Sequence, residues 1–408
     1  MREGPLRPAV FTIPTHRSFA DALAEGLIKR FGKDPLGLAR GRILLPNNRA
    51  VRSVTEAFVR ASGSGLLLPR LIPIGDPEID ERIGGALDPI DDGPPVPRAI
   101  DPLERLLTLA SILGRSGASA AEALRLAADL ARTLDALLVE QIDPSRLAEA
   151  VGEAGELAKH WQHSLARLQL IYQAWPAVLQ ERGAIDLAER RNLLLHRLAE
   201  RWAEAPPEGF TVAAGITTAA PAVAAVLARV AWMDGGMVVL PGLSLASIMP
   251  DEEWDALGPN DEGAGDPAHP QYHLKLLLDR MGVRREEVEP WHYGGRAASS
   301  PGRARAAANA MAAPDFSHKW QHLRASERRL SGVRVAELPD AASEAQAIAL
   351  ALREALETPG KTAALATPDR QLATRVSALL RRWGIEADDS AGTPLSQTPA
   401  GTLMLGIA

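Results

Sequence analysis

The turn Pro14–Ser18, which reads Pro-Thr-His-Arg-Ser, has residue types that can hold a phosphate group. It follows the apolar run Val10–Ile13 and precedes an amphipathic stretch, so a helix is expected to begin where a strand ends. The first N–H groups of such a helix, together with a guanidinium, attract anions. The turn has no glycine to let the backbone wrap a triphosphate and no lysine to reach its terminal oxygens. We therefore expect no ATP hydrolysis here. A purely structural turn is the favoured interpretation, and contact with a phosphate of DNA or another anion is the alternative. The candidate contact residues are Thr15, His16, Arg17 and Ser18.

A second strand-to-helix turn lies within the stretch Leu44–Arg60. Its apolar strand ends in a proline, which is followed by Asn47, Asn48 and Arg49 and then by a helical pattern. Polar side chains and helix-opening N–H groups at the carboxyl ends of parallel strands lie where ligands bind in open α/β folds. These side chains also suit contacts to a nucleic-acid backbone. We predict a DNA contact at these three residues, and a structural Asx-turn is the alternative.

The only Gly-Lys-Thr sequence, Gly360–Thr362, lacks the other features of a phosphate-binding loop. Such a loop needs a glycine five residues earlier, where this chain has Ala355. It must also follow a strand and begin a helix, whereas this stretch follows a helical pattern and precedes an apolar run. We predict an ordinary turn.

Other polar clusters have simpler explanations than chemistry. Two histidine pairs have metal-ligand spacing but no evident third ligand nearby in sequence. The acidic groups are interpreted as solvated loops. The arginine-rich run is interpreted as a flexible linker, with direct DNA contact as the alternative. In sequence order these clusters are His160 and His163, Asp251–Asp255, His269 and His273, Gly294–Ala310, and Asp388–Asp389.

Composition excludes several classes of site. The 408 residues include no cysteine, so disulfides, thiolate zinc sites, Fe–S clusters and cysteine nucleophiles are excluded within this chain. No apolar run is long enough to span a membrane, and a cytoplasmic location is expected. The net charge of −6 is not that of a typical nucleic-acid-binding domain, although local basic clusters remain compatible with it.

Strand and helix signals alternate over two parts of the chain, which predicts an α/β fold with a parallel sheet. Between them lie four amphipathic helical patterns with no intervening strand signal. The pattern indicates an inserted helical subdomain and the start of a second α/β domain. The expected divisions are 1–100 with 205–245 for the first α/β domain, 101–204 for the helical insertion, 246–330 for an irregular linking segment, and 331–408 for the second α/β domain.

Several stretches together resemble one known family. The stretch LLPNNRAVRSVTEAFVR is similar to motif Ia of superfamily-one helicases, which touches single-stranded DNA. In FTVAAGITTAAPAVAAVLARV, Ala213-Ala214-Gly215 stand where such helicases carry Mg²⁺-binding acids. Further stretches, among them AELPDAASEAQAIA, ATPDRQLATRV, RRWGIEADDSAGTPLSQTP, HPQYHLKLLLDRMGV and KHWQHSL, complete the resemblance to the AddB family of double-strand-break repair proteins, in the variant that lacks a phosphate loop.

The resemblance implies a helicase-like (RecA-like) fold whose motor is inactive. It implies a subunit that binds DNA and an AddA partner in a helicase–nuclease, which resects double-strand ends for homologous recombination. The family's nuclease domain, with its metal and its Fe–S cluster, lies C-terminal to the region that this chain resembles, so no cofactor and no activity of its own are expected here. Two other functions stay open, an α/β enzyme that uses the histidine or acidic clusters on a small substrate, and a protein–protein scaffold without DNA contact.

Overall fold

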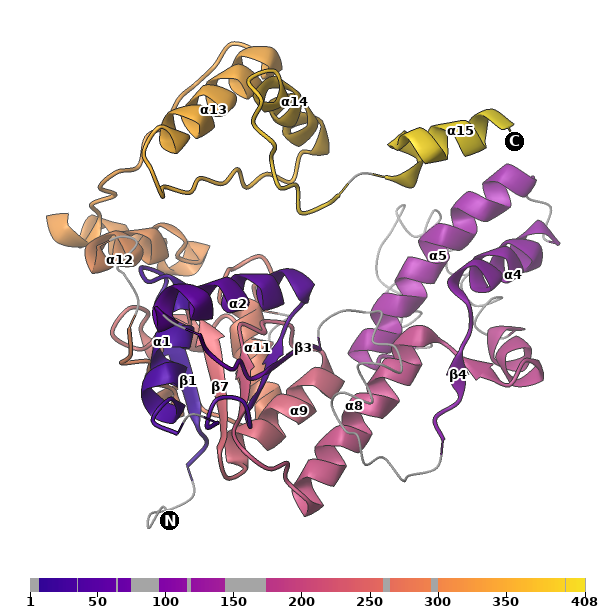
Figure 1. Ribbon diagram of the computed structural model, residues 1–408, viewed down its shortest axis with the longest axis horizontal. Helices are drawn as coiled ribbons and strands as arrows, with labels where there is room; N and C mark the ends of the chain where they lie inside the picture. The colour runs from indigo at the N-terminus through magenta and orange to yellow at the C-terminus, as the bar shows by residue number, and fades with distance from the viewer. Residues whose placement is uncertain are drawn as a thin grey trace. The chain divides into compact units, whose positions relative to one another are not determined.

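A computed structural model shows two compact units, Met1–Ser331 and Gly332–Ala408 (Figure 1). Each unit is considered by itself. The structure describes residues 7–34, 36–63, 65–74, 95–115, 119–143, 174–259, 265–294, 300–392 and 394–407.

The first unit is built on a six-stranded sheet with the order β3-β2-β6-β7-β1-β8. Every strand pairing in this sheet is parallel, which confirms the predicted α/β class. The four central strands are nearly continuous apolar runs, as expected for strands that are covered on both faces. The strands are β1 (Val10–Ile13), β2 (Arg42–Leu45), β3 (Arg70–Pro73), β6 (Thr211–Ala214), β7 (Gly236–Pro241) and β8 (Glu289–Pro290).

Helices α1 (Phe19–Phe31) and α2 (Asn48–Ser62) cover one face of the sheet (Figure 1). Side chains from alternate strand positions, such as Phe11 and Val239, point to this face and meet Leu23 of α1. Because successive strand residues alternate between faces, their neighbours along each strand belong to the other core.

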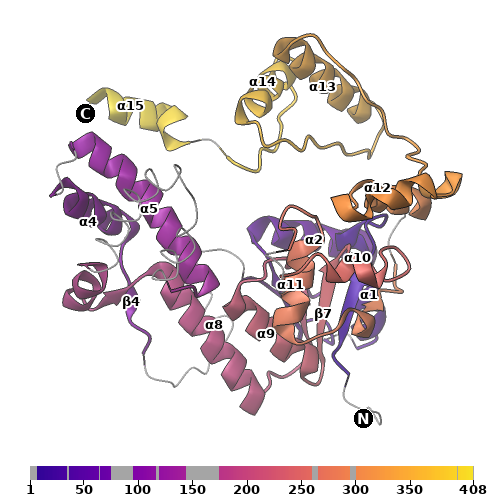
Figure 2. The ribbon, with the colours of Figure 1, turned by 180° about the vertical axis from the view of Figure 1, so that it is seen from behind.

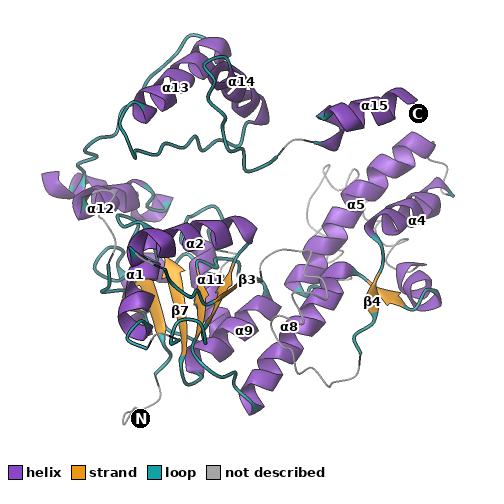
Figure 3. Ribbon diagram, in the orientation of Figure 1, coloured by secondary structure: helices purple, strands orange, loops and turns teal. Residues whose placement is uncertain are grey.

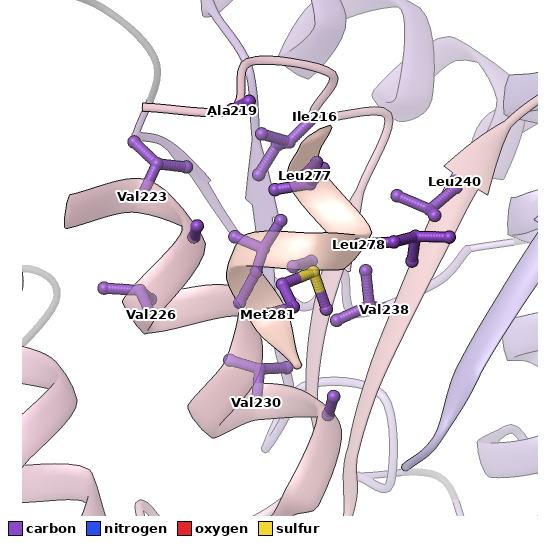
Figure 4. Packing of buried hydrophobic residues seen from close by; sticks show 14 of the residues in the cluster. Ile216, Ala219, Val223, Val226, Val230, Val238, Leu240, Leu277, Leu278 and Met281 are labelled. Carbon is purple, nitrogen blue, oxygen red and sulfur yellow. The ribbon is translucent and has the colours of Figure 1, made fainter. Parts of the chain in front are cut away.

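Helices α8 (Leu187–Glu204), α9 (Pro221–Trp232) and α11 (Tyr272–Met281) cover the opposite face, which Figure 2 shows from behind. In Figure 4 the side chain of Met281 lies beside that of Val238 of β7, and the side chain of Leu278 lies beside that of Leu240. The second half of α8 contributes Leu195, Leu198 and Trp202 to the same core, so this helix is anchored on the sheet.

A group of helices lies between β3 and β6 in sequence and surrounds its own small core (Figure 3). It contains α4 (Pro102–Gly114), α5 (Ala120–Glu140) and a helix over residues 174–181. The expectation of no strand here was wrong, because β4 (Arg98–Ala99) and β5 (Ala184–Ile185) pair in a parallel two-stranded sheet. Two-residue strands leave too short a pattern to detect in sequence. The predicted helix around Trp161, with His160 and His163, lies outside the described residues.

Residues 246–331 differ from the irregular linker expected there. They contain α10 (Asp251–Asp255), α11, β8, α12 (Pro301–Ala310) and the short 3₁₀ helices η1 (Arg285–Glu287), η2 (Pro314–Gln321) and η3 (Ala325–Glu327). The arginine-rich run expected to be a flexible linker ends in α12, whose cap Ser300 accepts a hydrogen bond from the N–H of Arg303 at 3.2 Å. This segment is part of the folded first unit.

The second unit contains α13 (Ala341–Leu356), α14 (Arg370–Arg381), η4 (Leu395–Gln397) and α15 (Pro399–Ile407). The first two helices begin after the aspartate caps Asp340 and Asp369, whose carboxylates accept hydrogen bonds from N–H groups of the first turn. The strands expected over 332–340 and 362–369 are not formed among the described residues of this unit. A strand needs a neighbour for its N–H and C=O groups, and Val335 is 88% exposed. Gly360–Thr362 lies in a turn after α13, as predicted.

None of the helices in the described part of the chain combines the length and the apolar character that crossing a bilayer requires.

Candidate functional site

The carboxyl edge of the first unit's sheet has a crevice between β1 and β7. The chain leaving β1 enters α1 on one face, and the chain leaving the adjacent β7 leads to α11 on the other face. Neighbouring parallel strands whose connections diverge in this way leave an opening at their carboxyl ends, where open α/β folds bind ligands. The turn Pro14–Ser18 follows β1 directly and therefore lies at this opening.

Arg17 is fixed at the edge of this crevice. Its Nη1 donates a hydrogen bond of 2.7 Å to the carbonyl oxygen of Gly294, which follows β8. Arg17 also lines a cavity of about 460 Å³ together with Thr15, Thr217 and His273. A guanidinium carries five N–H donors, so the bond to Gly294 leaves donors for a ligand. Arg17 is therefore held in place and still able to bind an anion.

The hydroxyl of Ser18 makes a side-chain contact and does not cap α1. Ser18 occupies the N-cap of α1, but its hydroxyl makes no cap hydrogen bond and instead donates to Asp21 Oδ2 at 2.7 Å. Arg60 of α2 binds the same aspartate at 2.6 Å. Those two hydrogen bonds and the charge of Arg60 lower the pKa of Asp21, although partial burial opposes this shift. Ser18 thus takes part in a network that joins α1 to α2.

A second cavity, of about 360 Å³, lies beside the first and shares Thr15 with it. His16 and His269 line it, and α12 covers it with alanine side chains and with Arg305. Burial, and then the positive charge of Arg17, lower the pKa of His16 below its ordinary value of 6.5, so the imidazole is neutral at neutral pH. The described residues that line the two cavities include no carboxylate.

The loop after β7 is fixed by side chains that sequence reasoning did not select. Gln271 accepts a hydrogen bond from the N–H of Ser244 at 2.8 Å and donates one to the carbonyl of Gly242 at 3.1 Å. Gly242 has φ = +65°, a conformation that favours glycine. Thr12 Oγ1 accepts from the N–H of Leu243 at 3.0 Å. These contacts join positions up to 231 residues apart, and no local sequence pattern indicates them.

Asn47 caps α2, and its side chain accepts a hydrogen bond from the N–H of Ala50 at 2.9 Å. For Asn47, the structural alternative therefore holds, because its side chain is engaged in the helix cap. Asn48 and Arg49 are exposed on the first turn of α2. β6 and β7 separate β2 from β1, so the two predicted contact turns lie about 14 Å apart, three strand spacings, along one edge of the sheet.

The remaining predicted clusters do not assemble into a metal site in the described part of the chain, where no three potential ligand side chains come together. His269 is buried, and its Nδ1 accepts a hydrogen bond from the N–H of Gln271 at 3.1 Å. Its predicted partner His273 is exposed. Glu253 is buried and pairs with Lys319 of η2 at 2.6 Å, so this carboxylate of the acidic group is not a solvated loop residue.

No protein-family model matches this sequence, and a search of the curated proteins finds no match either. The geometry and residue chemistry of the sheet edge therefore carry the functional inference.

Proposed function

We propose that this chain is a helicase-like scaffold that binds DNA without hydrolysing ATP. In this proposal it is the N-terminal helicase-like portion of an AddB-type subunit, which acts with an AddA partner in double-strand-break repair by homologous recombination. The observation that carries the proposal is the position of the turn Thr15–Ser18. A cationic but glycine-free turn lies at the carboxyl-edge crevice where a phosphate loop would lie.

The strand order supports a RecA-like arrangement. β1 would carry the phosphate loop and β6 the Mg²⁺-binding acids, and β7 lies between these two strands. One intervening strand is the arrangement expected of a RecA-like sheet. β6 ends with Ala213 and Ala214 and is followed by Gly215, and none of these three residues carries a carboxylate.

The residues of this turn are better suited to binding a nucleic-acid phosphate than to hydrolysing a triphosphate. A backbone phosphate carries one charge and needs only one or two donors, which Arg17 and the exposed Thr15 can supply. A bound triphosphate needs close amide N–H groups, a lysine and a divalent ion. The exposed Asn48 and Arg49 would extend the contact along the edge towards β2.

The proposal is tested by the salt dependence of binding to fluorescein-labelled single-stranded DNA. For single strands, the slope of log affinity against log salt changes by about 0.7 for each phosphate contact. The double variant Arg17→Ala/Arg49→Ala should therefore lower the slope by about 1.4. The matched control is Arg381→Ala/Arg382→Ala, which removes the same charge from exposed positions of the second unit.

Equal slopes for the double variant and its control would contradict the DNA contact at the sheet edge. If the wild-type chain binds AddA but shows no salt-sensitive affinity for DNA at all, it is a protein–protein scaffold instead. Asn47 is left unchanged in this test because it caps α2, and its loss would alter the helix as well as the surface.

A further inference from the structure

Residues 300–331 form a positively charged segment in a chain whose net charge is negative. They contain six lysines and arginines against two acidic residues, a net charge of +4, whereas the whole chain has a net charge of −6. Five of the six cations, all arginines, are exposed, and in the described part of the chain none of these five guanidiniums forms an ion pair. Unpaired exposed arginines of one sign attract a polyanion. We define the basic surface as Arg303, Arg305, Trp320, Arg324, Arg328 and Arg329.

Short-range contacts hold the basic surface together as one body. Asn309 of α12 donates its side-chain N–H to the carbonyl of Glu327 at 3.1 Å. The carbonyl of the same asparagine accepts a hydrogen bond from Trp320 Nε1 at 2.7 Å. The carbonyl of Ser326 approaches Gly302, 3.7 Å from the position that a Cβ would take there. η2 and η3 therefore both pack against α12, so the arginines of α12 and those that flank η3 belong to one small surface.

Trp320 gives this surface a second property. Its side chain is 46% exposed, although its N–H is already satisfied by Asn309. An indole held by its edge keeps its orientation and can offer a ring face to a planar partner. Aromatic faces beside arginines are the recurring arrangement for single-stranded nucleic acid, in which the bases stack and the phosphates pair. An acidic protein would use the arginines but has no comparable use for the indole.

We propose that the basic surface binds single-stranded nucleic acid, with its arginines on phosphates and Trp320 stacked on a base. The choice of nucleic acid as the partner rests on the proposed function. The basic surface consists of other residues than the turns at the sheet edge, so the two sets can be substituted independently. Arg305 connects the two, because it belongs to the basic surface and also lines the cavity that contains Thr15 and His16.

The test measures binding of the full chain to fluorescein-labelled oligothymidylate of about 20 nucleotides between about 50 and 200 mM salt. The triple variant Arg324→Ala/Arg328→Ala/Arg329→Ala should lower the salt slope by about 2.1, which is about 0.7 for each of three phosphate contacts. Over this fourfold range of salt, the loss of affinity then becomes about 18-fold smaller than for the wild type.

The matched control is Arg115→Ala/Arg125→Ala/Arg132→Ala, which removes three exposed arginines, one from the C-cap of α4 and two from α5. It should leave the slope unchanged. Equal effects of the two triple variants would overturn the proposal, because the dependence would then come from overall charge. Polyglutamate that displaces oligothymidylate at an equal concentration of charges would also overturn it, and would assign the surface to an acidic protein.

Trp320→Ala should weaken binding about tenfold and leave the salt slope unchanged, because stacking releases no counterions. Trp320→Phe loses the bond to Asn309 but keeps a ring face, so it should retain most of the affinity. Equal losses in both variants would show that Trp320 acts only through folding, and would overturn its stacking role. The effect of the sheet-edge variant Arg17→Ala/Arg49→Ala on DNA binding is measured in a separate experiment. If this variant has no effect while the basic-surface variants do, the proposed edge contact fails and the basic surface stands.

Discussion

Gly26 of α1 is predicted to be a position where alanine, the better helix former, destabilises the protein. A Cβ at this position would lie 2.3 Å from Cζ2 and 2.8 Å from Nε1 of Trp291, far inside van der Waals contact. Trp291 is buried, and its Nε1 donates to the carbonyl of Ala22 at 2.9 Å. The indole would therefore have to move away from α1.

Three contributions determine the expected change in the free energy of unfolding for Gly26→Ala. Overpacking costs about 1–3 kcal/mol. Loss of the buried hydrogen bond to Ala22 costs about 1–3 kcal/mol. Alanine in a helix interior returns about 1 kcal/mol relative to glycine. Gly26→Ala should therefore lower the free energy of unfolding by about 1–5 kcal/mol, measured by urea unfolding followed by circular dichroism.

The decisive comparison uses a Trp291→Leu background, in which the atoms nearest to the new methyl group are absent. There Gly26→Ala should stabilise the protein by up to about 1 kcal/mol, because only the helix propensity remains. Destabilisation of similar size in both backgrounds would refute the packing of Trp291 against Gly26. Because Gly294 follows Trp291 closely and accepts a hydrogen bond from Arg17, Gly26→Ala should also weaken DNA binding.

Three further predictions concern single contacts. Asn47→Ala should destabilise the chain by about 1 kcal/mol in urea unfolding and Asn47→Ser by much less, since serine also caps helices; equal losses would contradict the cap. Burial lowers the pKa of His269 below 6.5, so the unfolded chain binds this proton more readily. The stability from neutral His269 is therefore fully present above pH 6.5 and is lost as the pH falls below it, by at most about 1.4 kcal/mol per pH unit. His269→Asn keeps an acceptor for the N–H of Gln271 and should flatten this pH dependence of stability. An unchanged dependence of the free energy of unfolding on pH would contradict the assignment to His269. Lys319→Met leaves Glu253 buried without its cation and should lower the free energy of unfolding by about 3 kcal/mol, whereas a loss below about 1 kcal/mol would show that the pair is open to water.

The sheet was predictable where its strands are continuous apolar runs between turn residues. β1, β2, β6 and β7 have this pattern, and their parallel pairing follows from the helices between them. β8 was not predictable, because it has two residues, one of them proline, and is fixed by the burial of Trp291. In the second unit, strands were predicted that do not form among the described residues. A strand-like sequence pattern forms a strand only where a neighbouring strand can pair with it.

The candidate site was predictable only in part. The position of Arg17 follows from its place after an apolar strand and before a helix. Its hydrogen-bond partner Gly294 is 277 residues away, and nothing in the sequence indicates their contact. The same holds for Gln271, whose amide fixes the loop after β7. Asn47 is a case in which the residue type suits both a cap and a ligand contact, and only the geometry reveals the cap.

The central claim is that the motor-shaped sheet holds nucleic acid and does not turn over ATP. It is tested most directly by titrating the full chain with single-stranded DNA in the presence of Mg²⁺ and ATP, while anisotropy and phosphate release are recorded together. The account predicts saturable, salt-sensitive binding with no phosphate release that depends on the strand. Strand-stimulated phosphate release that Arg17→Ala abolishes would contradict it.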